Sequence, residues 1–210
     1  MEKLIADQVL DLAAQHGIEV DRRSPLGVDP IVAVLDTLTE RGLVDAEALA
    51  TAHRLQVDGY HDRVRALMKG PLFSGDWLDL TFPPGWLGLI EQLVADLEAL
   101  PGGENLRCRQ LKEKFGTLRL YLDDQGLRID LLGGGGGVSI SPKECGLLGQ
   151  AQQLIGAAEM TSGSTCYVCG AAGTMRRYGW ILPLCDYHAG RNYRVLLGSY
   201  TTYYPGGDLN

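Results

Sequence analysis

Three cysteines and one histidine near the end of the chain are spaced in two pairs. In the first pair, Cys166 and Cys169 have two residues between them. The second pair, Cys185 and His188, follows after fifteen residues and has the same spacing. Two such pairs let four side chains converge on one tetrahedral ion, and this set of sulfur and imidazole ligands suits zinc. Because four protein ligands leave no position for water, we expect a structural rather than a catalytic zinc site.

The residues around these pairs predict the elements that hold the ligands. Gly170 follows the first pair, at a point where the backbone of a knuckle favours positive φ. Residues 174–184 predict a hairpin, and a helical run follows Cys185. A knuckle, a hairpin and a helix that supplies the last two ligands form a treble-clef zinc finger. We therefore expect this finger, with an aromatic tail, over residues 161–210.

Hydrophobic periodicity predicts helices earlier in the chain. Apolar residues recur at helical spacing in residues 86–100, after Pro84 and before a Pro-Gly-Gly stop. Three more helices are predicted over residues 4–16, 30–41 and 46–68, with Gly17, Gly42 and Gly70 at their ends.

Alternating apolar residues predict strands in the middle of the chain. Residues 106–113 and 117–123 flank Phe115-Gly116, a two-residue sequence that suits a turn. Short strands over 127–132 and 138–140, joined by the run Gly133–Gly137, and a helix over 147–160 follow. The expected fold class is α+β, with a small, mostly antiparallel sheet and one long helix. We expect an acidic helical region at 1–69, an α+β core at 70–160 and the finger at 161–210.

Charge is distributed unevenly along the chain. The 210 residues carry a net charge of −7, and residues 1–60 contain eleven acidic but only five basic residues. The low sequence pI of about 5.1 argues against broad, non-specific binding to nucleic acid or to an acidic membrane surface. The basic residues of the strands and the finger still form local positive segments. An anion-binding patch on an acidic protein is therefore compatible with the composition.

The sequence shows no targeting or membrane-spanning segment. Asp7 and Asp11 interrupt the apolar positions near the start, so no signal-peptide core is predicted. No stretch of 18 apolar residues is present, and we expect a cytoplasmic protein without membrane contact. Thiols stay reduced in that compartment, which favours metal binding over disulfides.

Two motifs together resemble a family of small, uncharacterised bacterial and phage-associated proteins. One is the block Lys112–Tyr121, which matches the pattern KEKFG-x-LR-x-Y, and the other is CxxCG…GW…LCxxH over Cys166–His188. The resemblance covers about residues 84–190. Thr117 stands where a glycine is commoner, and Gly133–Gly137 has the character of an insertion. The resemblance implies an α/β scaffold with a zinc finger and no particular activity.

Basic and aromatic residues are the candidates for partner binding. Arginines in the strands and the finger can contact phosphate, an acidic partner or the chain's own acidic helices, and charge alone does not decide among these. Aromatic residues near the end can pack on the core or form a partner surface. The candidate binding residues are Arg107, Arg109, Arg176, Arg177, Arg191, Tyr203 and Tyr204.

These features favour a non-enzymatic, zinc-stabilised module that binds another protein, in the manner of an immunity protein or a phage-encoded inhibitor. No catalytic constellation and no small-molecule substrate are indicated. The first alternative is a nucleic-acid-binding finger that uses the arginines. The second is an HNH-type nuclease, which needs a general-base histidine beside the finger. The finger hairpin contains none, and His53 and His61 are expected at the surface of a helix.

Overall fold

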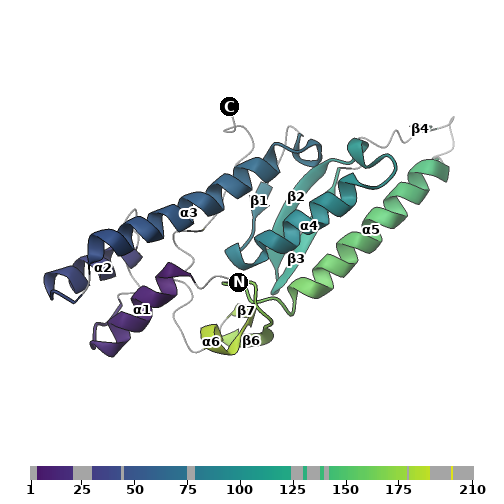
Figure 1. Ribbon diagram of the computed structural model, residues 1–210. Coiled ribbons are helices and arrows are strands. Elements are labelled where there is room, and N and C mark those ends of the chain that lie inside the picture. Colours follow the sequence, from purple (N-terminus) through teal and green to yellow (C-terminus); the bar gives the residue numbers. More distant parts are fainter. Residues whose placement is uncertain are drawn as a thin grey trace.

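The computed structural model describes residues 4–20, 30–43, 45–74, 79–123, 130–131, 138–139, 142–178, 180–189 and 200. The chain folds as a mixture of helices and small sheets, as the α+β prediction requires (Figure 1). Three helices lie at one end of the molecule and a helix-covered sheet lies at the other. The Cys/His segment lies between these two parts, next to the first helix.

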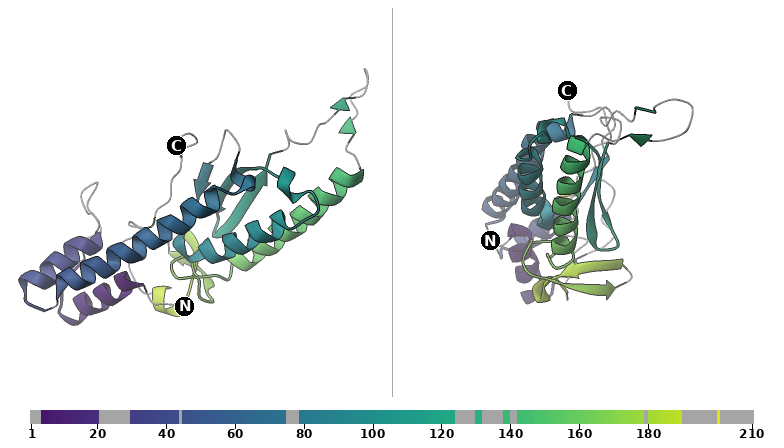
Figure 2. Two further views of the ribbon diagram at one scale, coloured as in Figure 1. Left: turned by 45° about the horizontal axis from the view of Figure 1, so that its top comes forward. Right: turned by 90° about the vertical axis from the view of Figure 1, so that its right-hand side faces the viewer.

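The helices of the first part match the sequence prediction. They are α1 (Ile5–Gln15), α2 (Pro30–Glu40) and α3 (Ala46–Met68), and each contacts the other two. Asp45 caps α3 by accepting a hydrogen bond from the backbone N–H of Ala48 at 3.3 Å. Gly17 and Gly42 follow α1 and α2 with φ of 64° and 65°, the left-handed conformation that ends helices. Helix α3 is long enough to extend from this bundle to the sheet (Figure 2).

The central sheet has three strands in the order β1-β2-β3. Strands β2 (Cys108–Lys114) and β3 (Thr117–Leu122) are antiparallel, as predicted, whereas β1 (Asp79–Thr81) pairs in parallel with β2. Helices α4 (Leu87–Glu98) and α5 (Pro142–Ser162) pack together, and α5 also contacts β3. The right-hand view of Figure 2 shows these helices on one side of the sheet. Within the described ranges, no helix covers its other side.

The remaining elements are short. Strands β4 (Asp130–Leu131) and β5 (Val138–Ser139) pair with each other, and β6 (Thr174–Tyr178) pairs with β7 (Trp180–Leu184). Helix α6 (Asp186–Ala189) follows β7 directly. Three 3-10 helices complete the order of elements: Pro71–Phe73, Pro84–Trp86 and Gly103–Asn105.

Two features of the central part differ from the sequence prediction. Strand β1 was not expected, because three residues between turn signals are too short to show an alternating pattern. Helix α5 begins at Pro142, five residues before the expected start, since proline fits the first turn of a helix.

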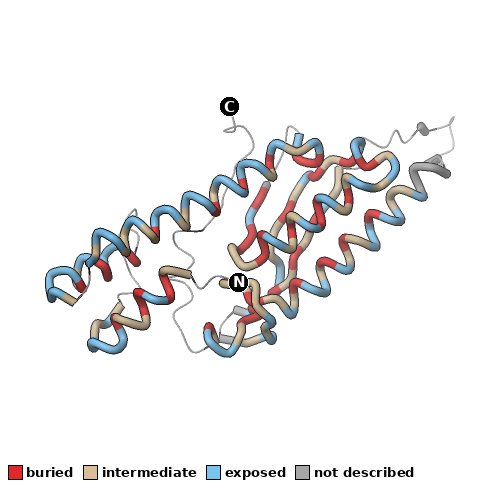
Figure 3. Tube along the Cα trace, in the orientation of Figure 1, coloured by how far each residue is buried: buried red, intermediate tan, exposed pale blue. Residues whose placement is uncertain are grey.

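Among the described residues, the buried apolar ones form two clusters. Figure 3 marks the buried positions in red along the chain. The larger one joins the C-terminal half of α3 to the sheet, α4 and α5, and Trp86 is buried in it. The smaller one joins apolar residues of α1 and α2 to Cys166, Val168, Leu182 and Leu184. The Cys/His segment thus shares a core with the N-terminal helices α1 and α2.

The aromatic residue Tyr200 docks on α3. It is 1% exposed, and its ring lies edge-on to Tyr60 at 5.4 Å and to His53 at 6.4 Å. The prediction that His53 lies at the surface is wrong: its side chain is buried, with 3% exposed, and the Tyr200 ring lies beside it. Of the predicted tail residues, Tyr203 and Tyr204 lie outside the described residues, as do those of the run Gly133–Gly137.

The β2–β3 turn contacts the β6–β7 hairpin. Phe115 and Gly116 both have positive φ, 54° and 80°, which defines a tight two-residue turn between the paired Lys114 and Thr117. A Cβ atom on Gly116 would lie 2.7 Å from the backbone oxygen of Ile181. Only glycine therefore fits where the two hairpins meet.

None of the helices in the described part of the chain is both long and apolar enough to cross a membrane.

Substituting two glycines tests the contact between the β2–β3 turn and the β6–β7 hairpin. Gly116→Ala places a methyl group against the backbone of Ile181 in a left-handed conformation, so we expect it to lower the free energy of unfolding by about 1–2 kcal/mol. Gly59→Ala is the matched control, because a Cβ at this position in α3 meets nothing within 4 Å. It should raise the same free energy by about 1 kcal/mol. Urea unfolding measures both, and a Gly116→Ala protein as stable as the wild type would contradict the contact.

Candidate metal centre

The four predicted ligands converge in space. Among the residues that the structure describes, Cys166, Cys169, Cys185 and His188 are the one group of Cys, His, Asp and Glu placed to hold a metal ion. Their ligand atoms all lie within 4.8 Å of one another. The Nδ1 atom of His188 is 3.5 Å from Sγ of Cys166 and 3.2 Å from Sγ of Cys185, and Sγ of Cys169 is 3.9 Å from that of Cys185. Bonds of about 2.0–2.3 Å to one tetrahedral ion require ligand separations of roughly 3.5–3.8 Å, which these values approach.

The first pair of ligands is held by a tight backbone knuckle. The N–H of Gly170 donates to the carbonyl of Cys166 at 2.9 Å, and the N–H of Cys166 donates to the carbonyl of Ala171 at 2.7 Å. Gly170 has φ of 73°, as predicted from its place after the pair. The second pair is set by the end of β7, which places Cys185 just before α6, and by His188 within that helix.

A second segment lies directly against the knuckle. The N–H of Gly85 donates to the carbonyl of Tyr167 at 3.1 Å, and the indole N–H of Trp86 donates to the carbonyl of Thr165 at 3.0 Å. A Cβ atom on Gly85 would lie 2.1 Å from the carbonyl oxygen of Cys166. Nothing in the sequence spacing indicated this close approach.

The histidine ligand is oriented by a carboxylate from α1. The Nε2 atom of His188 lies 3.0 Å from Oδ1 of Asp7, and both side chains are 2% exposed. A proton on Nε2 satisfies the carboxylate and leaves the Nδ1 lone pair for a metal ion. Carboxylate–histidine pairs of this kind hold metal-bound imidazoles in metalloproteins. Asp7 was missed from the sequence because it lies 181 positions before His188, on a helix interpreted only as acidic.

Further hydrogen bonds hold α1 beside the metal centre. The hydroxyl of Tyr187 donates to Oδ2 of Asp11 at 2.7 Å, one helical turn after Asp7. At the start of α1, the N–H of Ile5 donates to Oε1 of Gln56 in α3, an oxygen that also accepts from the hydroxyl of Tyr200. Helix α1 is therefore hydrogen-bonded to the Cys/His segment and to α3.

The protein groups by themselves favour charged forms within the cluster. Burial lowers the pKa of His188, but the hydrogen bonds to Asp7 and Cys166 raise it by a larger amount. The net result is a pKa of about 10. The hydrogen bond from the Cys169 thiol lowers the pKa of Cys166 to about 3, and the same bond raises the pKa of Cys169. A metal ion must displace the thiol protons and the Nδ1 proton, so metal binding releases protons and weakens as the pH falls.

Four of the predicted binding residues lie in the described part of the chain. The Arg107 guanidinium donates to the backbone oxygens of Glu104 and Leu106, and Arg176 pairs with Asp186 at 2.5 Å. Arg109 is exposed at the start of β2, and Arg177 is exposed on β6. Arg191, like Tyr203 and Tyr204, lies outside the described residues.

Exposed apolar side chains gather where the two hairpins meet. Phe115, at the tip of the β2–β3 turn, is 72% exposed, and Met175 and Ile181 are 41% and 37% exposed. Gly116 joins them, because a Cβ on it would be 2.9 Å from Sδ of Met175 and 2.7 Å from the backbone of Ile181. We call Phe115, Met175 and Ile181 the junction patch. Sequence reasoning treated the Phe-Gly pair only as a turn, and no signal in it distinguishes an exposed phenylalanine from a buried one.

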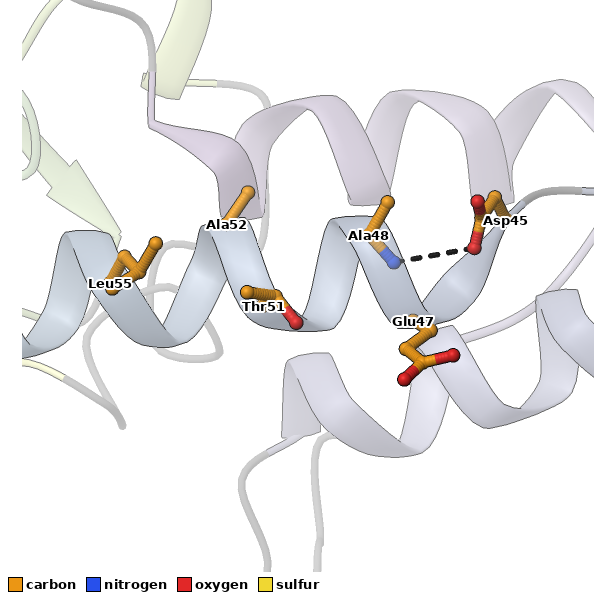
Figure 4. A pocket seen from close by; sticks show the side chains of 6 residues that line it. All are labelled: Asp45, Glu47, Ala48, Thr51, Ala52 and Leu55. Atoms are coloured by element: carbon orange, nitrogen blue, oxygen red, sulfur yellow. Dashed lines mark hydrogen bonds between the residues drawn. The ribbon is translucent and has the colours of Figure 1, made fainter.

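A shallow depression lies on α3. It is lined by Asp45, Glu47, Ala48, Thr51, Ala52 and Leu55 (Figure 4). The Asp45 carboxylate is engaged in capping the helix, and no histidine, cysteine, lysine or arginine lines the depression.

No model of a known protein family, no curated protein and no solved structure matches the chain. The resemblance of residues 84–190 to a bacterial and phage-associated family stays a prediction. What can be proposed about function depends on the geometry described above.

Removing one ligand tests the metal centre. In Cys169→Ser the hydroxyl is a poor replacement for a thiolate, so we expect purified protein to lose its bound metal and the finger to unfold. Elemental analysis and proteolysis of the C-terminal segment measure the two effects. Cys108→Ser is the control, because Cys108 is buried in the larger cluster away from the ligands. A Cys169→Ser protein that keeps its metal would contradict the ligand assignment.

The partner of the histidine gives a separate prediction. Asp7→Asn keeps the shape of the side chain but removes its charge, and we expect about tenfold to hundredfold weaker Zn2+ binding in a chelator competition. Asp36→Asn, on the exposed side of α2, should leave the affinity within twofold. Equal affinities for the two variants would show that Asp7 does not support the ligand.

Proposed function

We propose that the metal ion is zinc and that it has a structural role. Three sulfurs and one imidazole nitrogen in a compact, nearly buried group form the ligand set of structural zinc sites. The order knuckle, β6–β7 hairpin and α6 supports a treble-clef finger. Four protein ligands leave no place for the water that a catalytic zinc activates.

We further propose that the protein is a non-enzymatic binding module for another protein. The junction patch is the observation that carries this proposal. A phenylalanine exposed at a hairpin tip gives up the burial that would stabilise it, and its left-handed backbone costs about 1 kcal/mol or more. Asparagine is the residue that such a turn prefers. Phenylalanine at this position is therefore explained by a partner that covers it.

A role as an immunity protein or a phage-encoded inhibitor belongs to the same proposal. It is motivated by the net charge of −7 and by the resemblance of residues 84–190. The acidic N-terminal helices, a surface separate from the junction patch, can complement the basic cleft of an enzyme that acts on nucleic acid. A toxin gene next to the gene for this chain would support the role.

One observation favours nucleic-acid binding as a second candidate function. On the open side of the sheet, the Lys112 ammonium lies 5.5 Å from the centre of the Tyr121 ring, and Lys114 lies 5.6 Å from that of Phe115. Aromatic rings beside cations can stack the bases of a single strand. Binding of this kind falls steeply with salt.

Site-specific photo-crosslinking in the natural host separates these functions. With a benzoylphenylalanine at position 115, we expect one discrete adduct that protease destroys and nuclease leaves intact. The same group at position 55, where Leu55 is 67% exposed on α3, serves as the control and should not give that adduct. The proposal is contradicted by a nuclease-sensitive adduct at 115 or by the same pattern at both positions.

Replacing Phe115 should separate stability from binding. Phe115→Asn creates the preferred turn sequence, so we expect the free energy of unfolding to rise by about 1 kcal/mol. A crosslinking residue at position 175 should at the same time lose most of its adduct. Urea unfolding and adduct yield are the two measurements. Loss of stability, or an unchanged yield, would show that the phenylalanine serves the fold alone.

A further inference from the structure

Resting on the proposed binding function, we infer the chemistry of the partner: an acidic protein segment that places an apolar side chain on Phe115, Met175 and Ile181 and carboxylates against Lys114 and Arg177. The two hairpins together expose one apolar patch, and the positive side chains of Lys114 and Arg177 lie beside it.

The apolar part of this surface is built from both hairpins. Arg177 pairs with Ile181 across the β6–β7 hairpin, so these two side chains lie on the same face. Met175 is two residues before Arg177 on the same strand and therefore lies on that face too. The opposite face carries Leu182 and Leu184, which are buried in the smaller cluster. The Met175 face is thus the one turned away from the N-terminal helices, and Gly116 packs against it.

Two cations flank this apolar centre. Arg177 shares the hairpin face with Met175 and Ile181 and is exposed. Lys114 immediately precedes Phe115, is exposed, and holds its ammonium 5.6 Å from the centre of the phenyl ring. Positive groups at the rim of an apolar centre attract a partner with negative charge.

The neighbouring carboxylates are engaged within the protein. Oε1 of Glu113 accepts the N–H of Gly116 at 2.6 Å, and Glu159 pairs with Arg119 at 3.0 Å. Asp186 pairs with Arg176, whose side chain lies on the opposite face of the hairpin from Arg177. Acidic charge near the junction patch is therefore used in the turn and in ion pairs, whereas Lys114 and Arg177 are directed to the surface that the patch occupies.

A random library of 12-residue displayed peptides, selected on the full-length, zinc-loaded protein, tests this chemistry. We expect enriched peptides to combine Asp or Glu with a large apolar residue and to bind more weakly as NaCl is raised. Lys114→Glu with Arg177→Glu should weaken a synthetic enriched peptide about tenfold or more by fluorescence polarisation. Arg54→Glu with Lys69→Glu, both on exposed positions of α3 or its end, makes the same change in net charge and should change binding less than twofold.

Two results would overturn the inference. One is enrichment of peptides without acidic residues, or peptide binding that Lys114→Glu with Arg177→Glu leaves unchanged. The other is tighter binding of a labelled (dT)20 oligonucleotide that depends on Phe115 and Lys114, which assigns the surface to a single nucleic-acid strand.

Crosslinking distinguishes this inference from the proposed function. If the adduct formed at position 115 maps to a neutral or basic protein segment, the acidic partner is wrong although protein binding stands. If no protein adduct forms there, the binding function itself fails.

Discussion

The buried contact between His188 and Asp7 is the constraint on which the arrangement of the protein depends. It joins a metal ligand near the end of the chain to the first helix, with both side chains almost completely removed from water. A buried carboxylate is costly without a donor, and a metal-bound imidazole supplies one only if the finger is folded. Folding of the finger and docking of α1 are therefore coupled through one hydrogen bond and the apolar cluster around it.

The knuckle is also held from its other side. Gly85 and Trp86 donate hydrogen bonds to backbone carbonyls of the knuckle, and Trp86 belongs to the larger cluster. The metal centre thus stands between two hydrophobic cores and contacts both. A metal ion bound by these four residues would therefore connect the N-terminal helices to the sheet.

The same arrangement accounts for the junction patch. Because one face of the β6–β7 hairpin packs on the N-terminal helices, its other face is left for the β2–β3 turn and for solvent. Gly116 lets the turn approach closely, and Phe115 is then held at the tip with its ring exposed. The exposed ring is the feature on which the proposed binding function rests.

Sequence patterns were sufficient to predict the features that depend on residues close together in the chain. The ligand spacing identified the metal cluster, helical periodicity located α1 to α4, and the positive φ of Gly170 followed from its place after a cysteine pair. Contacts between distant segments could not be predicted from these patterns: Asp7 with His188, Gly85 with the Cys166–Gly170 knuckle, and Gly116 with Ile181.

The sequence by itself determined which residues can bind a metal and where helices form, because both depend on spacing within a few turns of chain. Only the tertiary structure decided which carboxylate orients the histidine and which apolar side chains stay exposed, because these depend on how the two cores close around the finger.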